Sequence, residues 1–300
     1  MALSHAPHWT TIEWAEHIRE LELASRRVRY VDYGVGPPLV LVHGLGGSWQ
    51  SWLENIPALG QDHRVIAIDI PGFGASETLP PGTPFDGYVA VLAALIERLD
   101  LTDLTLVGHS MGGLLSGRYA ASQPQRLRGL ALVSAGGIAL SPARLKLIVR
   151  GFLVFNSFFS RPGVIRAFTR RPRLRGLLLF AILDDGRSLS GAMAAEVLPL
   201  MAAPGFADAV VAAGEAAADS RFEQVAVKTV LLWGRGDRIL PLAEAARLTA
   251  RMPQARLEVF DRAGHCPMFE LPEDFNSSLA AFVAASAPIQ PTPTAPTGRW

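Results

Sequence analysis

The sequence predicts an α/β protein with a mostly parallel central sheet, flanking helices and an inserted helical segment. Two observations carry this prediction. Short β-branched and Leu-rich runs alternate with longer helical patterns, which favours a parallel sheet with right-handed crossovers. The central runs are also apolar throughout rather than at every second position, which is typical of strands covered on both faces.

The strand and helix candidates follow one another in a regular order. Residues 21–33 predict an opening hairpin. Six apolar runs then predict the central strands: PLVLVH at 38–43, RVIAIDI at 64–70, LTLV at 104–107, GLALVS at 129–134, TVLLW at 229–233 and LEVF at 257–260. Helices are expected at 85–99, 114–122, 242–251 and 272–285.

One long stretch breaks this alternation and defines the predicted domains. Residues 138–220 contain no clear strand, so we expect a helical lid inserted between the runs at 129–134 and 229–233. The core α/β domain then comprises residues 1–137 and 221–287. The Pro- and Thr-rich tail at 288–300 is expected to be disordered.

Composition excludes several classes of protein. The chain has 300 residues, of which 49% are hydrophobic and 18% charged, enough to bury a large core. A net charge of +1 offers no argument for nucleic acid as a partner. The single cysteine, Cys266, excludes an intrachain disulfide framework and a cysteine-based zinc cluster. Residues 1–29 lack an apolar signal-type segment and no run of 18 apolar residues occurs, so a cytoplasmic location is expected.

The candidate nucleophile is Ser110, at the centre of Gly108-His109-Ser110-Met111-Gly112. This pentapeptide matches G-x-S-x-G, in which the serine occupies a strained turn between a strand and a helix. The motif follows an apolar strand-like run and precedes a predicted helix, which is the context that the motif requires. The alternative is a Gly-Ser turn with no chemistry.

A serine hydroxyl needs an adjacent base and an acid that orients the base. His265 follows the last predicted strand and is the candidate base; the alternative is an exposed loop histidine. Asp237 follows the run at 229–233 and is the candidate acid, although a helix-capping role is also open. Asp184 and Asp185 also lie between serine and histidine, but within the predicted lid.

The HGLGG sequence at 43–47 predicts an oxyanion hole at the end of a strand. We expect backbone N–H groups of Leu45 and Met111 to stabilise a tetrahedral oxyanion, and His43 to hold the loop by hydrogen bonds. The alternative is a Gly-rich turn. No G-x-G-x-x-G or P-loop pattern occurs, so no nucleotide cofactor is predicted. No paired His/Glu motif occurs either, so no metal is predicted.

Taken in order, these pieces resemble the α/β-hydrolase superfamily over residues 30–285. The matching segments are HGLGG, DIPGFGAS at 69–76, GHSMGG at 108–113, LLWGRGD at 231–237 and AGHCPMFE at 263–270. The resemblance implies a serine-nucleophile hydrolase of the esterase-like branch, acting on a small-molecule carboxylic ester without a cofactor.

Other branches of the superfamily fit less well. Epoxide hydrolases and haloalkane dehalogenases carry an aspartate nucleophile. Hydrolases that cleave C–C bonds in meta-cleavage products typically place tryptophan after the catalytic histidine, where this chain has Cys266; they remain the first alternative. A hydrolase-like small-molecule receptor is a further alternative, because such proteins retain the triad.

The predicted lid also concentrates positive charge. Residues 144–175 contain eight arginines and one lysine but no acidic residue. Apolar pieces interleave with them, and Phe152, Phe155, Phe158 and Phe159 are candidates for substrate binding. A basic and aromatic segment predicts contact with a membrane surface or an anionic lipid. The simpler alternative is a solvated basic face over an ordinary pocket.

Overall fold

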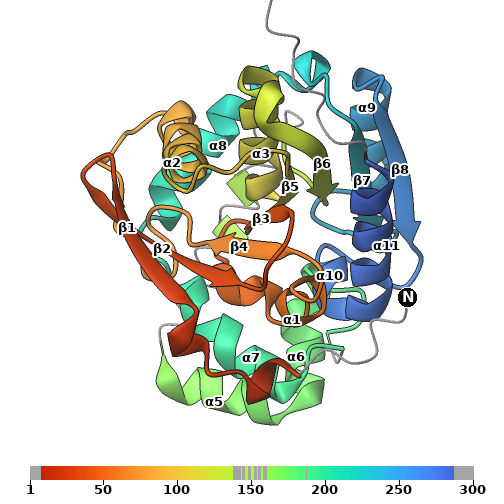
Figure 1. Cartoon of the computed structure of the whole chain (residues 1–300). Coiled ribbons are helices and arrows are strands. Elements are labelled where there is room, and N and C mark those ends of the chain that lie inside the picture. The colour runs from red at the N-terminus through yellow and green to blue at the C-terminus, as the bar shows by residue number, and fades with distance from the viewer. Residues whose placement is uncertain are drawn as a thin grey trace, which may run out of the picture.

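One twisted sheet of eight strands forms the centre of the protein (Figure 1). The computed structural model describes residues 8–137, 143, 146–147, 150–151, 154, 157, 161–186 and 188–286. The strand order is β1-β2-β4-β3-β5-β6-β7-β8. The first three strands of that order pair antiparallel, and the remaining pairs are parallel. The strands are β1 (Ile18–Leu23), β2 (Arg26–Tyr33), β3 (Pro38–Val42), β4 (Arg64–Ile68), β5 (Leu104–His109), β6 (Leu127–Val133), β7 (Thr229–Gly234) and β8 (Ala255–Phe260).

Both faces of the parallel strands are buried, which explains their continuous apolar runs. On β3, Val40 packs into one hydrophobic cluster and its neighbour Leu41 into another; on β6, Leu130 and Ala131 divide in the same way. All four side chains are fully buried. Since successive side chains of a strand point to opposite faces, such strands have no polar alternation.

Helices cover the two faces. The first cluster lies under α2 (Phe85–Arg98), α3 (Met111–Ser122), α8 (Phe206–Ala216) and α9 (Leu242–Arg251). The second lies under α1 (Ile56–Leu59), α10 (Pro267–Glu270) and α11 (Pro272–Ala285). Among the described helices none alone is long and apolar enough to cross a membrane; one pair, Gly191–Met201 with Phe206–Asp219, reaches that length only across a bend of 84°.

The predicted α/β class is confirmed, and so are the opening hairpin and the six central strands. One helix boundary was wrong: α3 begins at Met111, three residues before the expected start. The Met-Gly-Gly sequence has weak intrinsic helix propensity, but the turn at Ser110 directs the chain into a helix at once.

The segment between β6 and β7 forms helices and turns but no strand, as far as the structure describes it. It includes α5 (Pro162–Arg170), α6 (Pro172–Leu178), a short 3-10 turn (Leu179–Ala181), α7 (Gly191–Val197) and α8. In Figure 1, α5, α6 and α7 gather at one end of the molecule, beyond the sheet. Their action as a lid stays a prediction. The four phenylalanines predicted to bind substrate, Phe152, Phe155, Phe158 and Phe159, and the tail at 288–300 lie outside the described residues.

Candidate active site

Ser110 occupies a tight turn between β5 and α3. Its φ is +52°, in the left-handed region that residues with a side chain seldom adopt. The two glycines of the motif are required because the chain is crowded here. A Cβ at Gly108 would clash with the carbonyl oxygen of Gly112, and a Cβ at Gly112 would clash with that of His43. The turn presents the Ser110 hydroxyl at the carboxyl end of β5, the edge where sites of open α/β sheets form.

The three residues predicted to act together form one chain of hydrogen bonds. Ser110 Oγ lies 3.0 Å from Nε2 of His265. Nδ1 of the same ring lies 2.8 Å from Oδ2 of Asp237. Asp237 follows β7 and His265 follows β8, so the parallel sheet brings their loops beside Ser110 although the serine and histidine are 155 positions apart.

The carboxylate of Asp237 determines which nitrogen of His265 carries the proton. Asp237 Oδ1 accepts the backbone N–H groups of Ile239 at 2.9 Å and Leu240 at 2.8 Å, which leaves Oδ2 for the Nδ1–H of His265. The Nε2 lone pair then faces the Ser110 hydroxyl. This is the tautomer that a histidine base needs in order to take a proton from serine.

The HGLGG loop lies directly beside Ser110. A Cβ added at Gly44 would stand 2.9 Å from the Cβ of Ser110. Leu45 and Met111 both line the pocket, and neither of their backbone N–H groups donates a hydrogen bond within the described chain. The two predicted oxyanion donors are therefore free within the described chain, and their role stays a prediction.

His43 holds this loop and is not available as a base. Its Nδ1–H donates to the Gly44 carbonyl at 2.7 Å, and its Nε2 accepts the N–H of Ile70 at 2.9 Å. Complete burial lowers the pKa of His43 to about 4, so the ring is neutral near pH 7. The carboxylate of Asp69 accepts the N–H of Trp49 at 2.8 Å and secures the other end of the loop.

His109 supports the loop that carries His265, a role that its sequence position does not predict. Its Nε2–H donates to the carbonyl of His265 at 2.9 Å, and burial lowers its pKa well below the ordinary value. The ring is therefore a neutral donor. Cys266 Sγ lies 3.8 Å from the same Nε2, and burial raises the pKa of this thiol. Both side chains line the pocket.

Glu270 is the second residue that sequence reasoning missed. Its carboxylate is buried and accepts three backbone N–H groups: Gly264 at 2.6 Å, Asp184 at 2.6 Å and Asp185 at 3.3 Å. The backbone N–H of His265 in turn donates to the Ile182 carbonyl at 2.7 Å. Glu270 thus ties the loop that carries His265 to the end of the inserted segment. Burial raises the pKa of Glu270 to about 7, although the three N–H groups oppose that rise.

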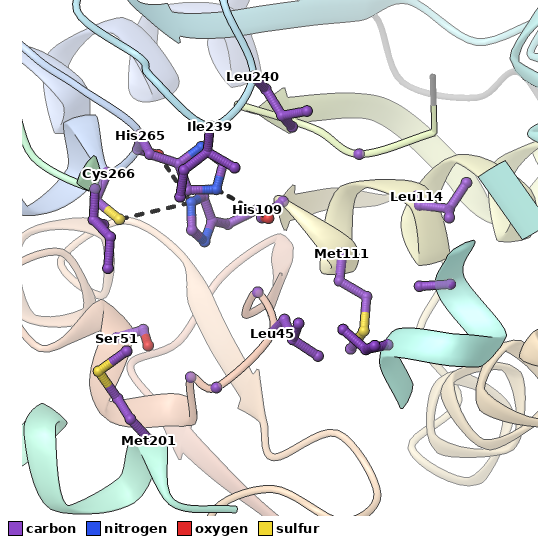
Figure 2. A pocket seen from close by; sticks show the side chains of 18 of the residues that line it. Leu45, Ser51, His109, Met111, Leu114, Met201, Ile239, Leu240, His265 and Cys266 are labelled. Atoms are coloured by element: carbon purple, nitrogen blue, oxygen red, sulfur yellow. Dashed lines mark hydrogen bonds between the residues drawn. The ribbon is translucent and has the colours of Figure 1, made fainter. Parts of the chain in front are cut away.

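A cavity of about 430 Å³ opens onto Ser110. Figure 2 shows Ser51, Met201 and Cys266 on one side of His109 and His265, and Met111 and Leu114 on the other. Side chains of the inserted segment complete both walls; they are Leu179, Ile182, Leu183, Leu189, Val197, Leu198, Met201, Val210, Ala213, Ala217 and Ala218. The walls are thus mainly aliphatic. Within the described chain the lining includes no lysine, arginine, aspartate or glutamate.

The chain belongs to the α/β hydrolase fold family, since residues 37–272 match that family. It is 32% identical over 270 residues to a 2-hydroxy-6-oxo-2,4-heptadienoate hydrolase of Pseudomonas putida, covering 85% of this chain and 91% of the relative. It is 30% identical over 275 residues to the dihydrolipoyllysine-residue acetyltransferase component of an acetoin cleaving system, also of Pseudomonas putida, covering 88% of this chain and 69% of the relative.

Solved structures share the fold at lower identity. A thermophilic esterase from Thermogutta terrifontis superimposes with a TM-score of 0.71 at 23% identity, covering 89% of this chain and 98% of the esterase. The family membership makes this chain a hydrolase of the α/β superfamily. Among the described residues, no group of three or more His, Cys, Asp or Glu side chains is placed to hold a metal ion.

Proposed function

We propose that the protein is a serine hydrolase that cleaves carboxylic esters of apolar acyl groups through an acyl-enzyme intermediate. One observation carries the proposal: the hydrogen-bonded chain from Asp237 through His265 to Ser110 opens into an aliphatic cavity. A carboxylate, a correctly oriented imidazole and an exposed hydroxyl are the parts that acyl transfer requires.

Acylation begins when Ser110 Oγ attacks the ester carbonyl carbon. His265 Nε2 takes the hydroxyl proton, and Asp237 stabilises the imidazolium that forms. The carbonyl oxygen becomes an oxyanion that accepts the N–H groups of Leu45 and Met111. As the C–O bond to the alcohol breaks, the imidazolium returns its proton to the leaving oxygen.

Deacylation repeats these steps with water as the nucleophile. His265 takes a proton from the water, which attacks the acyl carbon, and the same two N–H groups receive the charge. The imidazolium then gives its proton to Ser110 Oγ, releasing a carboxylic acid and restoring the enzyme.

The charge of the cavity favours an ester over the main alternative. The relative from Pseudomonas putida is named for a dienoate, which carries a carboxylate. Burying a carboxylate costs several kcal/mol unless a cation pairs with it. The only ionisable groups in the described lining are His109, His265 and Cys266, and burial keeps the first and last of these neutral. A neutral acyl chain has no such cost and gains from contact with the aliphatic walls.

The second candidate is hydrolysis of a C–C bond in such a dienoate, because the relative is 32% identical over nearly its whole length. The same three residues would serve that reaction. Besides Ser110, His265, His109 and Cys266, the described lining offers the polar side chains of Ser48 and Ser51 to the substrate's oxygen atoms.

Matched kinetics separate the two candidates. We would measure kcat/KM on p-nitrophenyl esters from acetate to decanoate, and on 2-hydroxy-6-oxo-2,4-heptadienoate, with Ser110→Ala as the blank for both assays. Ester hydrolysis should exceed the blank at every short and medium chain length, and kcat/KM should rise with acyl length until the cavity is full. Turnover of the dienoate with no ester hydrolysis above the blank would reject the ester proposal in favour of the second candidate.

A further inference from the structure

The segment that walls the cavity also presents an apolar outer surface. Leu177 and Phe180 are 80% and 59% exposed, whereas Leu179 and Leu183 are 3% and 1% exposed and line the cavity. This stretch therefore directs some of its apolar side chains into the cavity and others outward. Exposed apolar side chains that lie close together mark a contact surface more often than single ones do.

Four arginines precede these two side chains in the sequence. Arg161, Arg170, Arg171 and Arg173 are exposed, and none of the four forms an ion pair within the described chain. Several arginines elsewhere pair with carboxylates, as Arg64 does with Asp32 at 2.7 Å and Arg118 with Asp86 at 2.8 Å. No acidic residue occurs between positions 144 and 183. The positive charge is thus local in a chain whose net charge is only +1.

A buried arginine joins the two helices that carry this surface. Arg175, on α6, is 4% exposed and donates to the carbonyls of Phe168 and Thr169 near the end of α5. These bonds satisfy carbonyl groups that a helix end leaves free and hold α5 against α6. The exposed arginines and the apolar side chains are therefore held on one small structural unit.

We propose that this outer basic face, defined as Arg161, Arg170, Arg171, Arg173, Leu177 and Phe180, docks on an anionic lipid bilayer. Leu177 and Phe180 enter the interfacial region while the arginines contact the anionic headgroups. Charge complementarity identifies the occupant, because the face carries several cations and no described carboxylate pairs with them. Docking would place the wall formed by Leu179 and Leu183 next to the bilayer, so that an amphiphilic substrate has a short apolar path to Ser110.

The test is co-sedimentation of the full chain with vesicles, which measures binding without turnover and so is independent of the proposed ester hydrolysis. Vesicles contain either phosphatidylcholine alone or equal parts of phosphatidylcholine and phosphatidylglycerol. Binding should require the anionic lipid and should weaken as salt rises from 50 to 500 mM, since salt screens exposed charges. No binding to anionic vesicles at low salt, or equal binding to both kinds, would overturn the proposal.

Three variants assign the binding to this face. Arg170, Arg171 and Arg173 changed together to Gln should weaken partitioning by about 100-fold, at about fivefold for each of the three cations at the headgroups. Leu177→Ser with Phe180→Ser should weaken it about tenfold or more through lost insertion. The matched control changes Arg26, Arg98 and Lys228 to Gln, which removes the same charge elsewhere. An equal loss in the control, or full binding in either test variant, would show that the outer basic face is not the docking surface.

Discussion

Replacing Asp237 with asparagine exchanges one oxygen atom for an NH2 group, and the surrounding backbone dictates where that group must lie. Oδ1 of Asp237 accepts two N–H groups, from Ile239 at 2.9 Å and Leu240 at 2.8 Å. The new amide keeps its oxygen there, because the opposite orientation would place an NH2 group against two donors. Leaving buried donors unsatisfied costs about 1–3 kcal/mol each. The NH2 group is thus held against Nδ1 of His265.

This orientation reverses the tautomer of His265. Nδ1 must accept the amide proton, so the ring carries its own proton on Nε2 and donates it to Ser110 Oγ. A ring in that state cannot remove the serine proton. We expect kcat for a short p-nitrophenyl ester to fall by about 10⁴-fold, equivalent to about 5.5 kcal/mol, with little change in KM or in the thermal unfolding midpoint.

The control is Asp184→Asn, a matched change at another aspartate between Ser110 and His265 in the sequence. Oδ1 of Asp184 lies 3.5 Å from Arg238 in a half-exposed ion pair, and such pairs contribute at most about 1 kcal/mol. Its kcat should stay within about threefold of the wild type. The assignment of Asp237 as the acid that orients His265 is refuted if Asp237→Asn retains more than a tenth of the wild-type kcat. It is also refuted if Asp184→Asn is the variant that loses most of its kcat.

Three further outcomes are expected. Ser110→Ala should lower ester turnover by several orders of magnitude without altering the unfolding midpoint, and a fluorophosphonate probe should label the wild type at Ser110 by mass spectrometry; labelling at another residue would contradict the assignment. EDTA should leave ester hydrolysis unchanged, because the nucleophile is activated by His265. Glu270→Gln should change the pH dependence of stability. The pKa of Glu270 is raised from 4.5 to about 7 in the folded chain, so between these values the folded state retains a proton that the unfolded state has lost. Glu270 therefore lowers the free energy of unfolding as pH rises from about 4.5 to about 7, by at most about 3 kcal/mol. The Glu270→Gln variant should not show this pH-dependent decrease. Urea titrations of both proteins at pH 5 and pH 7 measure the free energy of unfolding. An identical change between the two pH values in both proteins would show that Glu270 does not titrate in this range.

The sheet was predictable because its local pattern and its tertiary environment agree. Strands such as β3 and β6 are buried on both faces, and their continuous apolar sequences report that burial directly. The candidate triad was predictable for a related reason. Ser110, Asp237 and His265 each follow a strand of one parallel sheet, so chain order alone places them at the same edge.

The groups that support the site were not predictable, because their partners are backbone atoms far away in the sequence. His109 donates to the carbonyl of a residue 156 positions later, and Glu270 accepts an N–H from a residue 86 positions earlier. Such contacts depend on how two loops meet and leave no periodicity. The one signal for Glu270 is an acidic residue within an otherwise apolar stretch, CPMFEL, which indicates a buried carboxylate with partners but not which partners.

Substrate choice in this fold depends on a different part of the chain from the catalytic atoms. The triad and the N–H donors come from loops at the carboxyl edge of the sheet, whereas 12 of the 30 lining residues of the cavity come from residues 179–218, between β6 and β7. One fold can therefore keep its catalytic loops while changes in the cavity wall select different substrates. Cys266 is the point where the two parts meet, because it adjoins His265 in sequence and also lines the cavity. A small side chain at that position leaves more open space beside the base than a tryptophan would. The residue after the histidine therefore affects the shape of the cavity, while the hydrogen bonds that join Ser110, His265 and Asp237 do not involve its side chain.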